Sequence, residues 1–187
     1  MTAVARRASA PTPLSVGVVV WLASELMFFA GLFAAWFTLR ADAEVWPPAG
    51  VDLEVTRTAL ATLVFIASSG TIHLAVAAGH RHDRAGAVRW LAVTALLGAL
   101  FLANTVAEWS TDEFGIDSHA YGSIFYLLTG FHGLHVLGGI LLMGAVGGAV
   151  AGRSRAPAAA TVEVAAAYWH FVDVVWIAVF LSVYVLG

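Results

Sequence analysis

The sequence lacks cysteine and lysine, and charged residues of any kind account for only 11% of its 187 positions. The absence of cysteine excludes a disulfide framework and any metal site with thiolate ligands. All nine basic residues are arginines, and there is no basic tract of the kind that binds nucleic acid. The polar, proline-interrupted N-terminal stretch has no apolar core followed by a cleavage site, so we do not expect a signal peptide.

Apolar residues dominate instead, at 60% of the sequence. A soluble domain carries about 25% charged residues, so this composition indicates a membrane protein. Five apolar runs each reach the roughly 20 residues that a helix needs to cross about 30 Å of hydrocarbon. They cover residues 14–39, 58–78, 88–107, 121–151 and 164–186. The alternating pattern of a membrane barrel is not seen, so we predict an all-α fold, one transmembrane domain over residues 1–187 with five spanning helices.

The distribution of arginine predicts how the helices are oriented. Seven of the nine arginines fall in segments on one side of the predicted bundle, namely Arg6, Arg7, Arg81, Arg84, Arg89, Arg153 and Arg155. The other side carries only Arg40 and Arg57 together with most of the acidic residues. Because basic residues accumulate on the cytoplasmic side, we predict a cytoplasmic N-terminus and a C-terminus outside.

Ionisable residues inside the runs are the candidate functional residues, because each costs several kcal/mol in hydrocarbon. They are Glu25, His73, His132, His135, His170 and Asp173, with Glu108 at the outer end of the third run. A rise of about 1.5 Å per residue puts most of them at mid-depth or in the cytoplasmic half. This favours one buried polar cluster between helices; in the alternative, each residue is satisfied separately by a backbone carbonyl or a hydroxyl.

Chemical roles for these residues remain open from the spacing alone. His132 and His135 share a helix face and are able to ligate haem, but the sequence has no HExxH motif and no matched histidine pairs on two helices. Glu25 is the only charged residue within its run, where it serves as a proton relay or as a hydrogen-bonded strut. The loop with Arg81, His82 and Arg84 either gathers anionic lipid or protons, or simply sets topology.

Four patches of the sequence carry a resemblance to a known family. They are SELMFFAGLF at 24–33, YGSIF at 121–125, TGFHGLHV at 129–136 and YWHFVDVVW at 168–176. In order and spacing they resemble subunit III of the haem-copper terminal oxidases, in the cytochrome c oxidase branch. Glu108 followed by Trp109 is similar to the family's glutamate–aromatic position. The five predicted helices match the short form found in actinobacteria, which lacks the first two helices.

The resemblance implies an accessory subunit of a proton-pumping oxidase that reduces O2 to water in aerobic respiration. It implies no redox centre in this chain, with haem and copper in partner subunits and subunit I as the main contact. The subunit would support proton uptake in subunit I and protect it during turnover. Glu25 matches the family's buried, carbodiimide-reactive glutamate. Other expected partners are membrane phospholipids, a subunit that replaces the missing helices and a cytochrome bc complex; the expected location is the bacterial plasma membrane.

Three alternatives are kept beside this interpretation. The nearest is a quinol-oxidising oxidase, whose members carry Ser-Asp where Ser24-Glu25 stands here. The second is a stand-alone membrane protein that ligates haem through histidine. The third is a transporter with Glu25 and Asp173 as proton carriers, although five spans without an internal repeat argue against it. Co-purification with a large subunit that contains haem and copper separates the oxidase from the last two.

Overall fold

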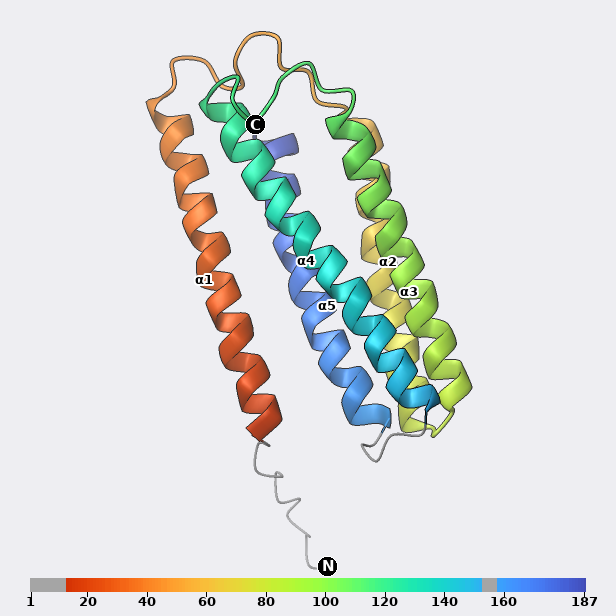
Figure 1. The fold of residues 1–187 in the computed structure, drawn as a ribbon. Coiled ribbons are helices and arrows are strands. Elements are labelled where there is room, and N and C mark those ends of the chain that lie inside the picture. Colours follow the sequence, from red (N-terminus) through yellow and green to blue (C-terminus); the bar gives the residue numbers. More distant parts are fainter. Residues whose placement is uncertain (1–12, 153–157) are drawn as a thin grey trace, which may run out of the picture.

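The computed structural model describes residues 13–152 and 158–187. They form the helices α1 (Pro13–Asp42), α2 (Val55–His80), α3 (Arg84–Trp109), α4 (Ala120–Ala151) and α5 (Ala158–Phe180), and α5 continues into the short π-helix η1 (Leu181–Val185) (Figure 1). All five long helices have the length and hydropathy to cross a membrane, and there is no strand among the described residues. The predicted all-α class with five spans is confirmed, and the chain is a multi-pass membrane protein.

Polar side chains cap the first turns of α3 and α4. Asp83 precedes α3, and its side chain accepts a hydrogen bond from the backbone N–H of Gly86 at 2.8 Å. His119 does the same for α4, with its Nδ1 accepting from the N–H of Gly122 at 2.8 Å. A side-chain acceptor at this position satisfies a backbone N–H that has no partner within the helix.

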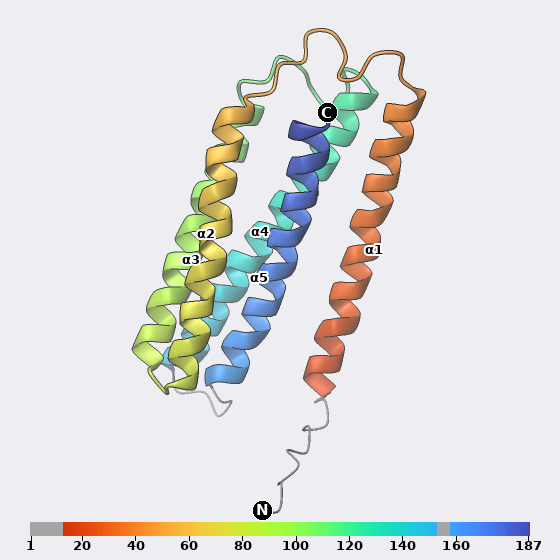
Figure 2. The ribbon, with the colours of Figure 1, turned by 180° about the vertical axis from the view of Figure 1, so that it is seen from behind.

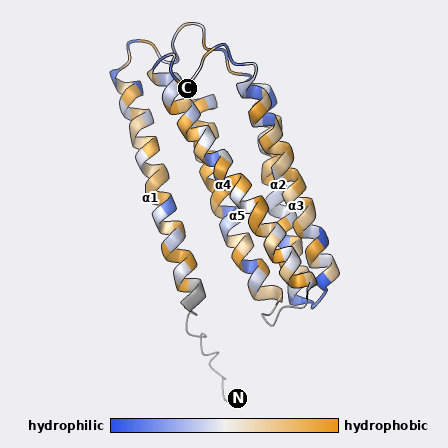
Figure 3. Ribbon diagram, viewed as in Figure 1, coloured by the Kyte–Doolittle hydropathy of each residue, from blue (hydrophilic) through white to orange (hydrophobic). Residues whose placement is uncertain are grey.

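Helices α2 to α5 form a four-helix bundle, and α1 lies against its edge. The closest neighbours are α2 and α3, while α5 packs against both α2 and α4. By contrast, α1 contacts α4 and, less closely, α5; Figures 1 and 2 show it at one side of the molecule, away from α2 and α3. In Figure 3 hydrophobic colours run along all five helices, and hydrophilic colours gather at their ends and in the loops.

Trp169 of α5 is the centre of the four-helix bundle and is fully buried. A Cβ atom at Gly98 of α3 would lie 2.5 Å from the tryptophan ring, and one at Gly139 of α4 would lie 2.7 Å from it. Only glycine leaves room for the indole at these two positions. The ring nitrogen donates to the Ser68 hydroxyl of α2 at 2.8 Å, so a single side chain joins four helices.

Connections at the two ends of the bundle alternate, so α1 begins at one end and α5 finishes at the other (Figure 1). Four of the arginines used to predict orientation, Arg6, Arg7, Arg153 and Arg155, lie outside the described residues. The direction of the chain across the membrane therefore stays a prediction.

Candidate functional site

The first polar group within the membrane spans joins α1 to α4. Nε2 of His135 lies 3.0 Å from Oε2 of Glu25, and both side chains are largely buried. The other carboxylate oxygen of Glu25 accepts from the indole N–H of Trp21 at 3.0 Å. The hydroxyl of Tyr168 donates to the backbone carbonyl of His135 at 2.9 Å, and its ring stacks on Trp21 at 5.1 Å. Residues from α1, α4 and α5 thus meet around a single carboxyl group.

The Glu25–His135 contact must hold a proton between its two atoms. Nδ1 of His135 lies 2.6 Å from the carbonyl oxygen of Phe131, which only accepts, so Nδ1 carries a hydrogen. A neutral ring would then turn an unprotonated Nε2 toward a carboxylate oxygen. The pair therefore contains a second proton, either on the imidazole beside a carboxylate or on the carboxyl group beside a neutral ring. Both forms have no net charge, which limits their cost in hydrocarbon.

A second polar group joins α2 to α5. The Ser69 hydroxyl lies 3.0 Å from Nδ1 of His170 and donates to Oδ2 of Asp173. The ring of His73, one helical turn from Ser69, lies 4.6 Å from the ring of His170 between centroids. Asp173 is buried, His170 is half-buried and His73 is exposed on the side of α2. The spacing of His170 and Asp173 does put them on one helix face, and that face is turned toward Ser69.

His132 differs from the other intramembrane histidines because it is enclosed by aromatic rings. Its side chain is 1% exposed, and its ring lies 4.8 Å from the ring of Trp176 and within 6 Å of Phe65 and Phe101. Neither ring nitrogen has a hydrogen-bond partner among the described residues. A histidine in this environment acts as an aromatic packing element.

Glu108 lies at the end of α3 and is buried against α2. Its carboxyl group accepts a hydrogen bond from the Thr58 hydroxyl at 3.0 Å. One turn further along α2, the Thr62 hydroxyl accepts from the indole N–H of Trp176 at 2.9 Å. These two contacts link α2 to α3 and to α5, and Thr58 lies in the first turn of α2.

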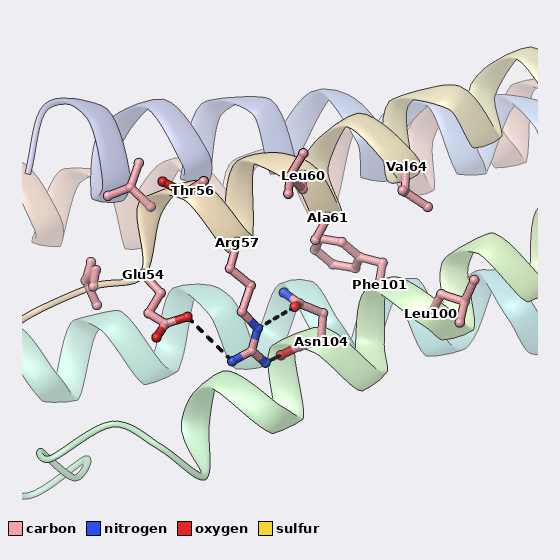
Figure 4. A pocket seen from close by; sticks show the side chains of 11 residues that line it. Glu54, Thr56, Arg57, Leu60, Ala61, Val64, Leu100, Phe101 and Asn104 are labelled. Carbon is pink, nitrogen blue, oxygen red and sulfur yellow. Dashed lines mark hydrogen bonds and ion pairs between the residues drawn. The ribbon is translucent and has the colours of Figure 1, made fainter.

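Arg57 forms a clamp between α2 and α3 at the same end of the bundle. Its Nε donates to the side-chain oxygen of Asn104 at 2.8 Å and its Nη2 to the Asn104 carbonyl at 3.1 Å, while Glu54 lies 3.9 Å from Nη1 (Figure 4). A groove of roughly 780 Å³ runs from this clamp between the two helices, and its walls include Leu60, Val64 and Leu100.

Asp112, in the connection from α3 to α4, faces this acidic end of the bundle. Burial raises the pKa of its carboxyl group, and the Tyr126 hydroxyl and the positive charge of Arg57 offset part of that rise. Arg57 forms an ion pair with Glu54, and its positive charge also acts on the carboxyl groups of Glu108 and Asp112.

The loop between α2 and α3 contains the three residues predicted as a lipid or interface site. Arg84 donates to the carbonyl of Val150 at 3.5 Å, which ties the start of α3 to the end of α4. His82 has a positive φ of 58°, so it makes the turn between the helices. Arg81 is the residue after the last turn of α2, where its N–H closes the helix on the carbonyl of Ala77. These roles are structural; lipid binding at the loop stays a prediction.

The structure therefore divides the predicted residues among separate places: Glu25 pairs with His135, three residues gather at Ser69, Glu108 meets Thr58, and His132 lies among aromatic rings. No hydrogen bond or ion pair among the described residues joins the Glu25–His135 pair to the Ser69 group, and Glu108 lies apart at the end of the bundle. Sequence reasoning missed the partners Trp21, Ser69 and Thr58. Their only signal was a hydroxyl or indole within an apolar run.

Histidine and carboxylate side chains are the groups in this chain that are able to ligate a metal ion. Within residues 13–152 and 158–187, no group of three or more His, Asp or Glu side chains is arranged to hold a metal ion. His132 and His135 share one helix, but the ring of His132 faces aromatic side chains and that of His135 faces Glu25.

Comparison with known proteins shows the family to which this chain is related. A family model described as cytochrome c oxidase subunit III matches residues 6–187. The chain is 42% identical over 177 residues to the cytochrome c oxidase subunit 3 of Thermostichus vulcanus, covering 91% of this chain and 86% of the relative. It is 43% identical over 181 residues to that of Corynebacterium diphtheriae, covering 93% and 88%. A "probable cytochrome c oxidase subunit 3" of Mycobacterium tuberculosis is 45% identical over 179 residues, with the same coverage of 93% and 88%.

Proposed function

This chain belongs to the cytochrome c oxidase subunit III family, and we propose that within the oxidase it is an accessory subunit without a redox centre. In this proposal the complex lies in the bacterial plasma membrane, pumps protons and reduces O2 with electrons from cytochrome c. Haem and copper are held by partner subunits. This chain packs on the catalytic subunit I, stabilises it and supports its proton uptake.

The observation that supports this role is how the buried carboxyl groups are used. Glu25 is engaged with His135 between α1 and α4, Asp173 with Ser69 between α5 and α2, and Glu108 with Thr58 between α3 and α2. Each of the three contacts crosses a helix–helix boundary. Side chains engaged in this way fix the positions of helices, which is what an accessory subunit needs in order to present a rigid surface to a neighbour.

Purification through a tag on this chain tests the assembly. We expect a large subunit with haem and copper to co-purify, and we expect the isolated chain to show no Soret band. A Soret band in the isolated chain would favour the haem-binding alternative. Oxidation of reduced cytochrome c by the complex, without oxidation of a quinol, would exclude the quinol-oxidase alternative.

Deletion of the chain tests the protective role. The oxidase that remains should start at normal activity and lose it faster during turnover than the complete complex does. The measurement is the decay of O2 consumption with successive turnovers, at a matched initial rate. An unchanged lifetime would contradict the protective role while leaving the family assignment untouched.

A further inference from the structure

His73 is exposed on the side of a helix that crosses the membrane. Along the helix axis, His73 lies about 8 Å from the middle of α2 (Val55–His80), toward its C-terminal end. The hydrocarbon core extends about 15 Å to either side of its centre, so the imidazole is within it. Long lysine and arginine side chains reach the interface from such depths, but the histidine side chain is too short to do so.

The polar group behind His73 has two atoms that no described residue satisfies. The Ser69 hydroxyl serves both Nδ1 of His170 and Oδ2 of Asp173. Nε2 of His170 and Oδ1 of Asp173 are buried and have no hydrogen-bond partner among the described residues. The contrast with His135 is sharp, because that ring has a partner at each nitrogen.

Exposed residues on one face of α2 (Ile66, Gly70 and His73) define an apolar strip with Val174 and Ile177 of α5. Val174 and Ile177 share a helix face with His170, whose ring lies beside that of His73. Ile66 is 42% exposed and Val174 is 64% exposed. A Cβ atom at Gly70 would meet nothing within 4 Å, so the backbone of α2 is open to close approach there. Figure 2 shows α2 and α5 beside each other on this side of the molecule, with no other described helix in front of them.

Lipid does not provide a hydrogen-bond partner for the His73 imidazole on this strip. Acyl chains offer no hydrogen bond, so an imidazole facing them would remain unsatisfied at a cost of several kcal/mol. Headgroups lie too far along the helix axis to reach it. The chemistry instead fits an apolar helix with one hydrogen-bonding side chain at the depth of His73. The open backbone at Gly70 suits the close packing of such a helix.

We propose that the strip of Ile66, Gly70, His73, Val174 and Ile177 is the contact with a transmembrane helix of another oxidase subunit, which presents a hydrogen-bonding side chain to His73. This rests on the proposed function, because it needs a partner subunit in the same complex. The partner helix bonds to the exposed imidazole of His73 and covers the α2–α5 seam.

Photocrosslinking in the assembled oxidase tests the contact. A photoreactive amino acid replaces Ile66, which is on the strip but outside the polar group. The control position is Leu96 of α3, which is 60% exposed. It lies at a depth similar to that of Ile66, because the neighbouring Thr94 bonds to Thr71 of α2. We expect the Ile66 position to crosslink to a transmembrane segment of another oxidase subunit, and the Leu96 position to do so far less.

Other crosslink products would overturn the proposal. Adducts at the Ile66 position with lipid alone, or with a second copy of this chain, would show a different occupant while the recovered complex still supports the proposed function. Failure of the unmodified chain to co-purify with any oxidase would overturn both proposals. The two failures are distinguished by whether haem and copper are recovered with the tag.

Substitution of His73 gives an independent test. In the assembled complex, His73→Leu should lower the fraction of this chain retained during detergent titration roughly fivefold, as expected for one lost hydrogen bond. His73→Gln, which keeps a hydrogen-bonding group, should restore most of the retention, and Leu96→Ala should resemble the unmodified chain. Equal retention for His73→Leu and the unmodified chain would overturn the proposal.

Discussion

Helix α1 and the bundle of α2 to α5 are held in place in different ways. Only 6% of the most apolar stretch of α1 is buried, whereas 50% of the corresponding stretch of α5 is. Two large side chains of α1 are fully enclosed, Phe29 and Trp36, which pack on α4. The Glu25–His135 pair supplies its main polar contact. Removal of a few side chains should therefore release α1 while the bundle persists.

The bundle is stabilised by a polar seam along α2. Five hydroxyl groups of this helix bond to side chains of α3 or α5. They belong to Thr58, Thr62, Ser68, Ser69 and Thr71. Since lipid is as apolar as a leucine side chain, helices in a membrane associate through packing and hydrogen bonds rather than through hydrophobic burial. The difference indicates that α2 to α5 form the scaffold and that α1 is attached to it by fewer contacts.

The largest effect is expected from filling the space beside Trp169. Gly139→Leu would push a side chain into the indole of Trp169. The indole cannot move away, because it packs against Gly98 and its N–H bonds to Ser68. We expect a loss of about 3 kcal/mol or more in stability, seen as loss of the chain from the purified complex. The matched control is Gly144→Leu on the same helix, where an added Cβ meets nothing within 4 Å. Equal losses for both variants would contradict the proposed central position of Trp169.

Next in size is the release of α1. Glu25→Ala removes the partner of a buried imidazole nitrogen and should cost about 1–3 kcal/mol. The effect should be confined to α1, so hydrogen exchange should accelerate in its peptides and not in those of α2 to α5. Uniform acceleration across all five helices would contradict the separation of the two regions.

Glu25→Gln is the matched variant for the same position. The amide keeps a hydrogen-bonding group, so the exchange rates of α1 should stay closer to those of the unmodified chain. The haem bands of the purified complex should be unchanged, because the proposed accessory role places no cofactor on this residue. A shifted or missing haem band would contradict that role.

A smaller effect is expected from the polar seam itself. Ser68→Ala removes the acceptor for the Trp169 indole and should cost about 0.6–1 kcal/mol. Ser24→Ala in α1 is the control, since among the described residues that hydroxyl bonds only to the Trp21 carbonyl of its own helix. Thermal inactivation of the purified complex measures both. If the two variants are equally stable, the hydroxyl groups of α2 do not distinguish the two regions.

The fold was largely predictable from the sequence, because span length and hydropathy are local properties. Five long apolar runs predict five helices whatever their neighbours are. The residues of the candidate site were also recognisable, since Glu25, His135, His170 and Asp173 are conspicuous in an apolar run. Their presence inside the spans needed no knowledge of packing.

The pairing of these residues was not predictable in the same way. Depth along the membrane normal places Glu25, His135 and His170 at similar levels, but it does not say which helices are neighbours. The structure puts α4 beside α1 and α2 beside α5. As a result, Glu25 pairs with His135 and His170 pairs with Ser69. The role of Ser69 depends on tertiary contacts, because a serine inside a membrane helix is common and carries no signal by itself.

The smallest effect is expected at Asp112, outside the spans. Its pKa is raised by burial, so the folded state disfavours the carboxylate and Asp112 costs stability at pH 7. Asp112→Asn should stabilise α2 to α5 by about 0.5 kcal/mol at that pH and leave the hydrogen exchange of α1 unchanged. As the pH falls toward the ordinary range of an aspartate, the carboxyl group becomes protonated in both states and the gain should vanish. Melting of the complex at several pH values measures this. A loss of stability at pH 7 that disappears on acidification would mean that Arg57 stabilises the native carboxylate more than burial disfavours it.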